Sequence, residues 1–273
     1  MTDSTTRHVS ATLEGTVSGR TRLELQLALP DLPGLRVDER LSVLLDGDTV
    51  EPVEAVTAHG NRVHVVEGAE GRLSVSYTAT ATGQSEPLQV TEADRILYTR
   101  PSRYVDSDRL LGFANKQFGK RTSRSANDLL LDVAAWVGSH LSYLPGSSRP
   151  TDGASDTLVM GAGVCRDYAH LVIALLRALD TPARLVAVYA PGCDPMDFHA
   201  VTEAAVDGEW RAVDATLLAP RQSLLRISTG RDAADTAFLT NFGGRLTLEQ
   251  STVTAVVDGD LPVDDTQAAV LLG

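Results

Sequence analysis

The sequence predicts an α+β protein, in which an antiparallel β-sandwich is followed by helices packed on a second antiparallel sheet. Between residues 12 and 90, short runs of alternating apolar and polar residues are separated by Gly, Asp and Pro, a pattern typical of antiparallel strands. After Arg100-Pro101, apolar residues recur at intervals of three and four, as on helices with one buried face. We therefore expect two domains, residues 1–98 and residues 99–273.

The strands of the first domain are predicted from alternation. Arg22–Leu29 carries leucine at every second position, and Leu41–Leu45 runs into an Asp-Gly pair, which is a hairpin-turn signal. Arg62–Val66 and Leu73–Thr78 alternate in the same way. The histidines of this segment are too scattered to suggest a metal site: His8, His59 and His64. We expect no metal, no cofactor and no catalytic side chain from residues 1–98.

Helix signals organise the second domain. One helix is expected to begin at Ser107 or Asp108 and to end at Phe118, because polar caps mark helix starts and the following glycine marks an end. A second helix is expected to begin at Asn127, with one apolar face that reaches Leu141. The remaining elements expected here are a strand at Arg184–Tyr189, a strand from His199 to a turn at Asp207-Gly208, a strand at Trp210–Val213, a late strand at Thr252–Val257 and a loose acidic tail at Leu261–Gly273.

A third helix begins at Cys165. In the stretch GAGVCRDYAHLVIALLRAL, residues 161–179, apolar residues recur on one face after the cysteine, and Asp180 and Pro182 follow where the helix should stop. Cys165 therefore lies in the first helical turn, where unpaired N–H groups and the helix dipole favour negative charge. A thiol at such a position ionises readily, and the same N–H groups can stabilise an oxyanion.

Two downstream residues suggest a role for this thiol. His199 lies in Asp-Phe-His-Ala and Asp214 in Asp-Ala-Thr, and a thiol, an imidazole and a carboxylate can together form an activated nucleophile. Cys165 considered alone is equally compatible with an inert buried thiol. His170 lies five residues after Cys165, about 140° round the helix, so we expect it to be a core histidine. Cys193 is expected to be a bystander.

These motifs, in this order, resemble the transglutaminase-like superfamily and its bacterial members that are described as cysteine proteases. The resemblance rests on GxGVCRDYAHL, Pro-Ala-Arg at residues 182–184, DFHA and DAT, and it covers roughly residues 98–242. It implies a papain/transglutaminase-like core with the nucleophile at a helix N-terminus. It further implies that Cys165 is the nucleophile, His199 its base and Asp214 the residue that orients the base.

The resemblance also implies three cleft residues. The segment equivalent to Tyr143–Pro150 approaches the catalytic cysteine in that family, so Tyr143 and Ser147 are expected in the substrate cleft. The second oxyanion donor is not evident from the sequence, and Tyr143 is the candidate for it. Val201 stands where an aromatic residue often follows His-Ala in the family, and we expect it near the cleft as well.

The implied reaction is acyl transfer from an amide or peptide bond through a thioester. Transfer to water would make the chain a peptidase or amidase, and transfer to an amine would make it a transglutaminase-like enzyme or an amide synthase in small-molecule or peptide assembly. A non-catalytic interaction module on the same fold is the third alternative, which the intact Cys165, His199 and Asp214 disfavour. The expected partners are peptide, protein or small-molecule amide substrates.

Composition limits the other classes of partner. The chain has 273 residues, of which 43% are hydrophobic, and a formal net charge of -12. Nucleic acids and anionic membranes attract positive charge, so neither is expected as a partner. The polar start MTDSTTRHVS lacks the apolar core of an export signal, and the chain has two cysteines. We therefore expect a cytoplasmic protein with reduced thiols.

Overall fold

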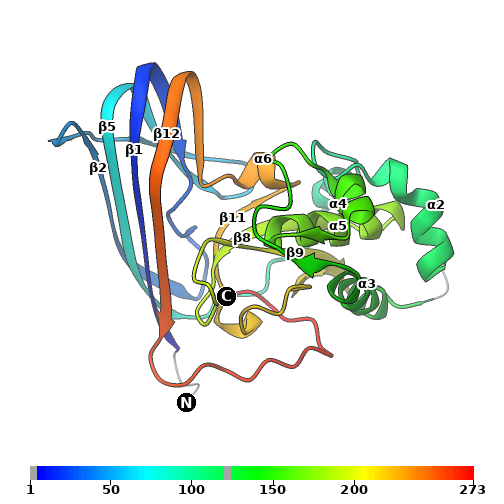
Figure 1. Cartoon of the computed structure of the whole chain (residues 1–273). Helices are drawn as coiled ribbons and strands as arrows, with labels where there is room; N and C mark the ends of the chain where they lie inside the picture. The colour runs from blue at the N-terminus through cyan, green and yellow to red at the C-terminus, as the bar shows by residue number, and fades with distance from the viewer. Residues whose placement is uncertain (1–4, 120–123) are drawn as a thin grey trace.

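The computed structural model describes residues 5–119 and 124–273 and confirms an α+β fold with antiparallel sheets. A curved six-stranded sheet forms one side of the molecule, and helices lie on the opposite side of a smaller central sheet (Figure 1). The large sheet has the order β12-β1-β5-β2-β3, and β4 pairs with β5. Its strands are β1 Thr6–Leu25, β2 Leu35–Leu45, β3 Asp48–Thr49, β4 Val53–Val56, β5 Arg62–Gly83 and β12 Leu239–Val257.

The β-sandwich predicted for residues 1–98 is corrected to a single sheet. The short runs seen in the sequence are parts of two long strands, since β1 has 20 residues and β5 has 22. Register shifts between Val17 and Leu23 interrupt the pairing of these strands without ending it, and such bulges bend a sheet. The large sheet packs its apolar face against side chains of the central sheet, including Tyr189 and Ile227.

The predicted division at residue 98 does not separate the two sheets. The last strand, β12, pairs along the whole length of β1, from Arg7 opposite Val257 to Leu25 opposite Leu239. The helical part of the chain is therefore inserted between β5 and β12 of one sheet. Two buried contacts join the parts further: the Tyr189 hydroxyl donates to the Leu27 carbonyl at 2.9 Å, and the Asn61 side chain exchanges two 2.8 Å bonds with the Thr229 backbone.

The central sheet has four antiparallel strands in the order β10-β9-β8-β11. They are β8 Ala183–Tyr189, β9 His199–Val206, β10 Glu209–Val213 and β11 Leu225–Gly230. A buried ion cluster crosses this sheet, because Glu203 on β9 accepts bonds from Arg184 at 2.7 Å and from Arg226 at 3.0 Å. Burial alone would raise the pKa of Glu203, but the two arginines outweigh it and lower that pKa to about 2.

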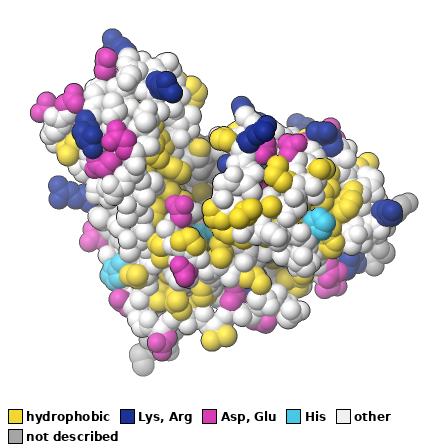
Figure 2. Space-filling view, viewed as in Figure 1, with side chains coloured by type: hydrophobic (Ala, Val, Ile, Leu, Met, Phe, Trp, Pro, Cys, Tyr) yellow, Lys and Arg dark blue, Asp and Glu magenta, His cyan; other side chains and the backbone are white. Residues whose placement is uncertain are grey.

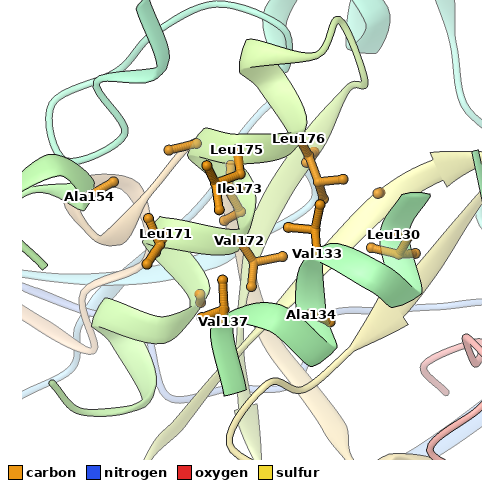
Figure 3. Close-up of a cluster of buried hydrophobic side chains, with 14 of the residues drawn as sticks. Leu130, Val133, Ala134, Val137, Ala154, Leu171, Val172, Ile173, Leu175 and Leu176 are labelled. Carbon is orange, nitrogen blue, oxygen red and sulfur yellow. The ribbon is translucent and has the colours of Figure 1, made fainter. Parts of the chain in front are cut away.

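Helices cover the other face of the central sheet, with α5 (Cys165–Ala178) at their centre beside α3 (Ala126–His140) and α4 (Ala154–Met160). The cluster of α3, α4 and α5 side chains in Figure 3 shows how α5 is enclosed, with valines and leucines of α3 against those of α5. From Asp167 to Ala178 every residue of α5 is buried. The helices and minor elements are α1 Glu92–Leu97, α2 Ser107–Phe118, α3 Ala126–His140, β6 Ser142–Tyr143, α4 Ala154–Met160, β7 Ala162–Gly163, α5 Cys165–Ala178, η2 Arg221–Ser223 and α6 Ala233–Thr236.

Two local predictions are corrected. The second predicted helix begins at Ala126, because the Ser125 side chain accepts the Asp128 N–H at 3.0 Å and caps it, rather than Asn127. The tail at residues 261–273 is not loose. Arg221 binds Asp264 through two 2.8 Å bonds, and Val270 pairs with Ala212. In the described ranges, no helix combines the length and apolar character that a membrane span requires.

Candidate active site

The two glycines before Cys165 have different physical roles. Gly161 ends α4 in the left-handed conformation, with φ of 65°, which glycine adopts without steric cost. At Gly163, an added Cβ would lie 2.6 Å from the Cβ of Asp167. This close approach lets Asp167 accept the Val164 N–H at 2.9 Å and cap α5. The GxGVCRD motif thus fixes the backbone that presents Cys165.

The loop that follows β6 is tied to the start of α5. Ser148 donates to Oδ2 of Asp167 at 2.5 Å, and Nη2 of Arg166 lies 3.0 Å from Oδ1 of the same carboxylate. Arg166 also donates to the Arg149 carbonyl at 3.3 Å. Asp167 lies in the first turn of α5, where acidic side chains are favoured. The structure adds that this buried carboxylate holds the loop beside Cys165.

His199 and Asp214 form a buried, charge-assisted pair. His199 begins β9, Asp214 follows β10, and Nε2 of His199 lies 2.7 Å from Oδ2 of Asp214. The other oxygen of Asp214 accepts the N–H of Thr216 at 2.9 Å and its hydroxyl at 2.7 Å. The two oxygens of Asp214 therefore serve separate purposes, since one binds the histidine and the other holds the Asp-Ala-Thr turn.

The pair favours a protonated imidazole. Burial alone would lower the pKa of His199, but the charge and hydrogen bond of Asp214 outweigh it, and the pKa is raised well above 6.5. Burial opposes ionisation of Asp214 as well, yet His199 and Thr216 bring its pKa below the usual 3.8. After Asp214, the nearby Cys165 thiol also raises the pKa of His199. Because Nε2 faces Asp214, Nδ1 is the ring nitrogen available to that thiol.

Cys165 and His199 open into a cavity of ≈ 320 Å³ at the junction of the two parts of the chain. The space-filling view shows the surface hollowed between the large sheet and the helical part, with hydrophobic side chains around the hollow (Figure 2). Cys165 is half-buried, whereas Cys193 is buried, and both thiols are free. Cys193 packs beside Val188 and Ala190, and its pKa is raised by burial, which nearby His199 only partly opposes.

The three residues predicted for the cleft lie in different surroundings. Tyr143 lies near Cys165, since burial and then the thiol raise the pKa of its phenol, but it is not among the described residues that line the cavity. Ser147 instead donates to the Leu144 carbonyl at 2.7 Å in its own turn. Val201 is 1% exposed and packs in a core with Val186 and Ala212, away from the cavity lining. The strand that presents His199 directs Val201 into the core, so its placement in the cleft is wrong.

His170 lies where the helix geometry predicted, away from Cys165. It is fully buried, its Nε2 accepts the Ala233 N–H at 3.1 Å, and its ring stacks on Tyr104 with centroids 5.5 Å apart. Burial lowers its pKa to about 4, although Asp232 opposes the shift. A neutral imidazole that accepts a backbone N–H fits the predicted structural role.

Sequence reasoning missed most of the cavity wall. Gln26 follows β1, Phe238 precedes β12 and Phe198 precedes His199, and all three line the cavity. The Gln26 N–H donates to the Phe238 carbonyl at 3.0 Å, so sheet pairing brings these distant positions together. Phe198 was visible in the DFHA motif, next to the expected base, and could have been singled out. In the described part of the chain, no three His, Cys, Asp or Glu residues are grouped closely enough to hold a metal ion.

A thiol at a helix N-terminus that shares a cleft with a histidine–carboxylate pair is typical of cysteine-dependent enzymes. Comparison with known proteins agrees with this class. Residues 112–215 match the model of the transglutaminase-like superfamily. A Cytophaga hutchinsonii protein of known structure, described as a "Putative Cysteine Protease", is 30% identical with a TM-score of 0.87, over 100% of this chain and 99% of that one. The chain belongs to the transglutaminase-like superfamily.

Two mycobacterial relatives are similar over shorter stretches. The uncharacterized protein ML0607 of Mycobacterium leprae is 26% identical over 181 residues, which are 63% of each chain. The uncharacterized protein Rv2569c of Mycobacterium tuberculosis is 31% identical over 123 residues, which are 40% of this chain and 39% of that one. The matches thus span less than two thirds of either relative. Family and fold together support cysteine-dependent catalysis in general. The cytoplasmic location and the partner classes stay predictions.

Proposed function

We propose that this protein is a cysteine-dependent acyl-transfer enzyme that acts on an amide or peptide bond. The observation that supports it best is the shared geometry of Cys165, His199 and Asp214, in which the thiol and the histidine line the same cavity and Nε2 of that histidine lies 2.7 Å from a buried carboxylate. This is the arrangement that activates a thiol as a nucleophile and keeps the histidine in one tautomer.

The reaction follows from these positions. His199 accepts the Cys165 proton, and the thiolate attacks the substrate carbonyl carbon to form a C–S bond. His199 then protonates the leaving amine as the C–N bond breaks, which leaves a thioester. Water, deprotonated by His199, releases the acid and restores the thiol. Asp214 stabilises the imidazolium and is not itself protonated.

The carbonyl oxygen becomes negatively charged in this reaction and needs hydrogen-bond donors. The Cys165 N–H is one candidate, and the hydroxyl of nearby Tyr143 is the second. Burial and then the nearby thiol raise the pKa of Tyr143 to about 12, so the phenol keeps its proton at neutral pH and can act as a donor. We expect Tyr143→Phe to lower turnover with little change in substrate binding, because this contact would form mainly in the transition state.

The experiment is limited alkylation with iodoacetamide at neutral pH, followed by peptide mapping. Cys165 should be modified well before Cys193, and preferential labelling of Cys193 would count against the proposal. Intact-protein mass spectrometry with casein peptides should then show an acyl adduct that Cys165→Ala lacks. The same incubation with casein peptides, repeated with added glycine methyl ester as an amine acceptor, separates hydrolysis from transfer to an amine. An amide product would indicate amide synthase or transglutaminase-like transfer, and free acid alone would indicate hydrolysis. Binding without any adduct would indicate a non-catalytic module.

A further inference from the structure

The cavity beside Cys165 has a chemical character that acyl transfer itself does not require. Phe198 and Phe238 stack on one side with ring centroids 4.5 Å apart and an interplanar angle of 16°. The central sheet supplies further apolar surface, and β12 supplies its first residue. The other apolar side chains that line the cavity are Pro150, Leu185, Ala187, Ala200, Ile227, Ala233, Ala237 and Leu239.

Charge is nearly absent from this wall. None of the described residues that line the cavity is an aspartate or a glutamate, and the charged side chains among them are Arg166 and His199. Arg166 is paired with Asp167 at 3.0 Å, and His199 with Asp214 at 2.7 Å. A cationic group that entered would lose its hydration without meeting a free counter-charge, which is unfavourable.

Gln26 is one of the polar residues in this wall. Its amide nitrogen is occupied, whereas its buried Oε1 has no hydrogen-bond partner among the described residues. Nε2 of Gln26 donates to the carbonyls of Asp235 and Ala237, both at 3.2 Å. These bonds hold the Gln26 side chain against the segment that leads into β12. A volume of ≈ 320 Å³ lies near the lower end of ligand cavities, which run from about 300 Å³ upward. It suits one large side chain next to the attacked carbonyl.

We infer that this cavity is the specificity pocket of the enzyme and that it takes a large apolar side chain, aromatic or branched, from the acyl part of a peptide substrate. The inference rests on the proposed function, because it assigns the substrate class of the same thiol. Selectivity then comes from burial of apolar surface against Phe198, Phe238 and Ile227, while lysine and arginine side chains are rejected.

The test uses N-acetyl dipeptidyl chloromethyl ketones, in which the thiolate displaces chloride and forms a thioether. Five reagents are compared: Gly-Gly, Phe-Gly, Gly-Phe, Lys-Gly and Gly-Lys. The rate of Cys165 modification is followed by intact-protein mass spectrometry, with iodoacetamide as the reference without a side chain. Phenylalanine at one of the two positions should accelerate modification by about tenfold or more over Gly-Gly, the size expected for burying an aromatic side chain. Lysine at that position should give no acceleration.

A pair of matched variants locates the effect. Ala187 lies on β8, in register with Ala200, and lines the cavity. Ala187→Phe, with Ala187→Leu as the milder replacement, should fill the space and abolish the ratio of phenylalanine to glycine rates. Ala55 lies on β4, where every residue is exposed, and is not among the described residues that line the cavity. Ala55→Phe adds the same side chain there and should keep the wild-type ratio.

The outcomes separate this inference from the proposed function. Equal rates for phenylalanine and glycine at both positions, or equal rates for lysine and phenylalanine, would overturn the pocket assignment even when iodoacetamide still selects Cys165. Iodoacetamide that fails to select Cys165 over Cys193 would overturn the proposed function and the pocket with it. A ratio that survives in Ala187→Phe would place the apolar selectivity elsewhere.

Discussion

Replacing Asp214 by asparagine separates the two roles of this side chain. In the folded protein one oxygen binds His199 and the other accepts two bonds from Thr216. An asparagine can keep its oxygen on Thr216 and then turns its NH2 group toward Nε2 of His199. That ring nitrogen must become an acceptor, so the proton moves to Nδ1, which faces Cys165. The turn is retained while the histidine adopts the wrong tautomer for a base.

The magnitude follows from burial and distance. His199 is 3% exposed and Asp214 is 4% exposed, so solvent screens their interaction weakly. Unit charges about 4 Å apart attract by about 4 kcal/mol at an effective dielectric constant near 20, and desolvation offsets part of this. Losing about 2.7 kcal/mol of it would lower the pKa of His199 and slow turnover by roughly a hundredfold.

The assay is the rate of iodoacetamide alkylation of Cys165 against pH, because this rate follows the thiolate. In Asp214→Asn the acid limb of the profile should move to higher pH, since the imidazolium that stabilises the thiolate is lost. Asp156→Asn is the matched control, because Asp156 caps α4 through the Gly153 N–H at 2.9 Å and is not among the cavity residues. An unshifted profile in folded Asp214→Asn protein would refute the reasoning.

Three further predictions concern the scaffold. Gly163→Ala should lower the melting temperature and slow the alkylation of Cys165, because its Cβ would lie 2.6 Å from that of Asp167. The control is Gly112→Ala, where an added Cβ meets nothing within 4 Å, and this variant should keep or raise the melting temperature. Glu203→Gln should cost about 3 kcal/mol in urea unfolding at neutral pH. The pKa of Glu203 is lowered from 4.5 to about 2, so its contribution is present above pH 4.5 and is lost as the pH falls toward 2. A mutant deficit that stayed constant down to pH 2 would contradict this. In NMR spectra the His170 ring should stay neutral down to about pH 4, and titration near its ordinary 6.5 would contradict its burial.

The parts of the site that sequence could predict are those set by short-range pattern. The run after Cys165 has helical spacing and a proline beyond its end, and α5 follows it. The turn between β9 and β10 is an Asp-Gly pair, with Asp207 at φ 51° and Gly208 at φ 89°. Because these elements are local, the expected positions of the thiol, imidazole and carboxylate agree with the structure.

The parts that sequence could not predict depend on pairing between distant segments. The alternation of β1 and β5 indicates strands but not their partners, so one continuous curved sheet was expected to be a sandwich of short strands. Gln26 and Phe238 meet only because β1 pairs with β12. Val201 shows the converse, since family analogy placed it in the cleft and strand geometry places it in the core.

The position of β12 at the end of the chain also determines the order in which the parts of the large sheet and of the site are synthesised. A ribosome makes β1 and β5 first, then the thiol, the histidine and the aspartate, and only afterwards the strand that pairs with β1. Until then β1 is an open sheet edge, which is prone to pair with other chains. Phe238 and Leu239, which help to form the pocket wall, emerge at this same last stage. On the proposed pocket assignment, a nascent chain carries Cys165, His199 and Asp214 before the pocket wall is complete, and selectivity is the last property that it acquires.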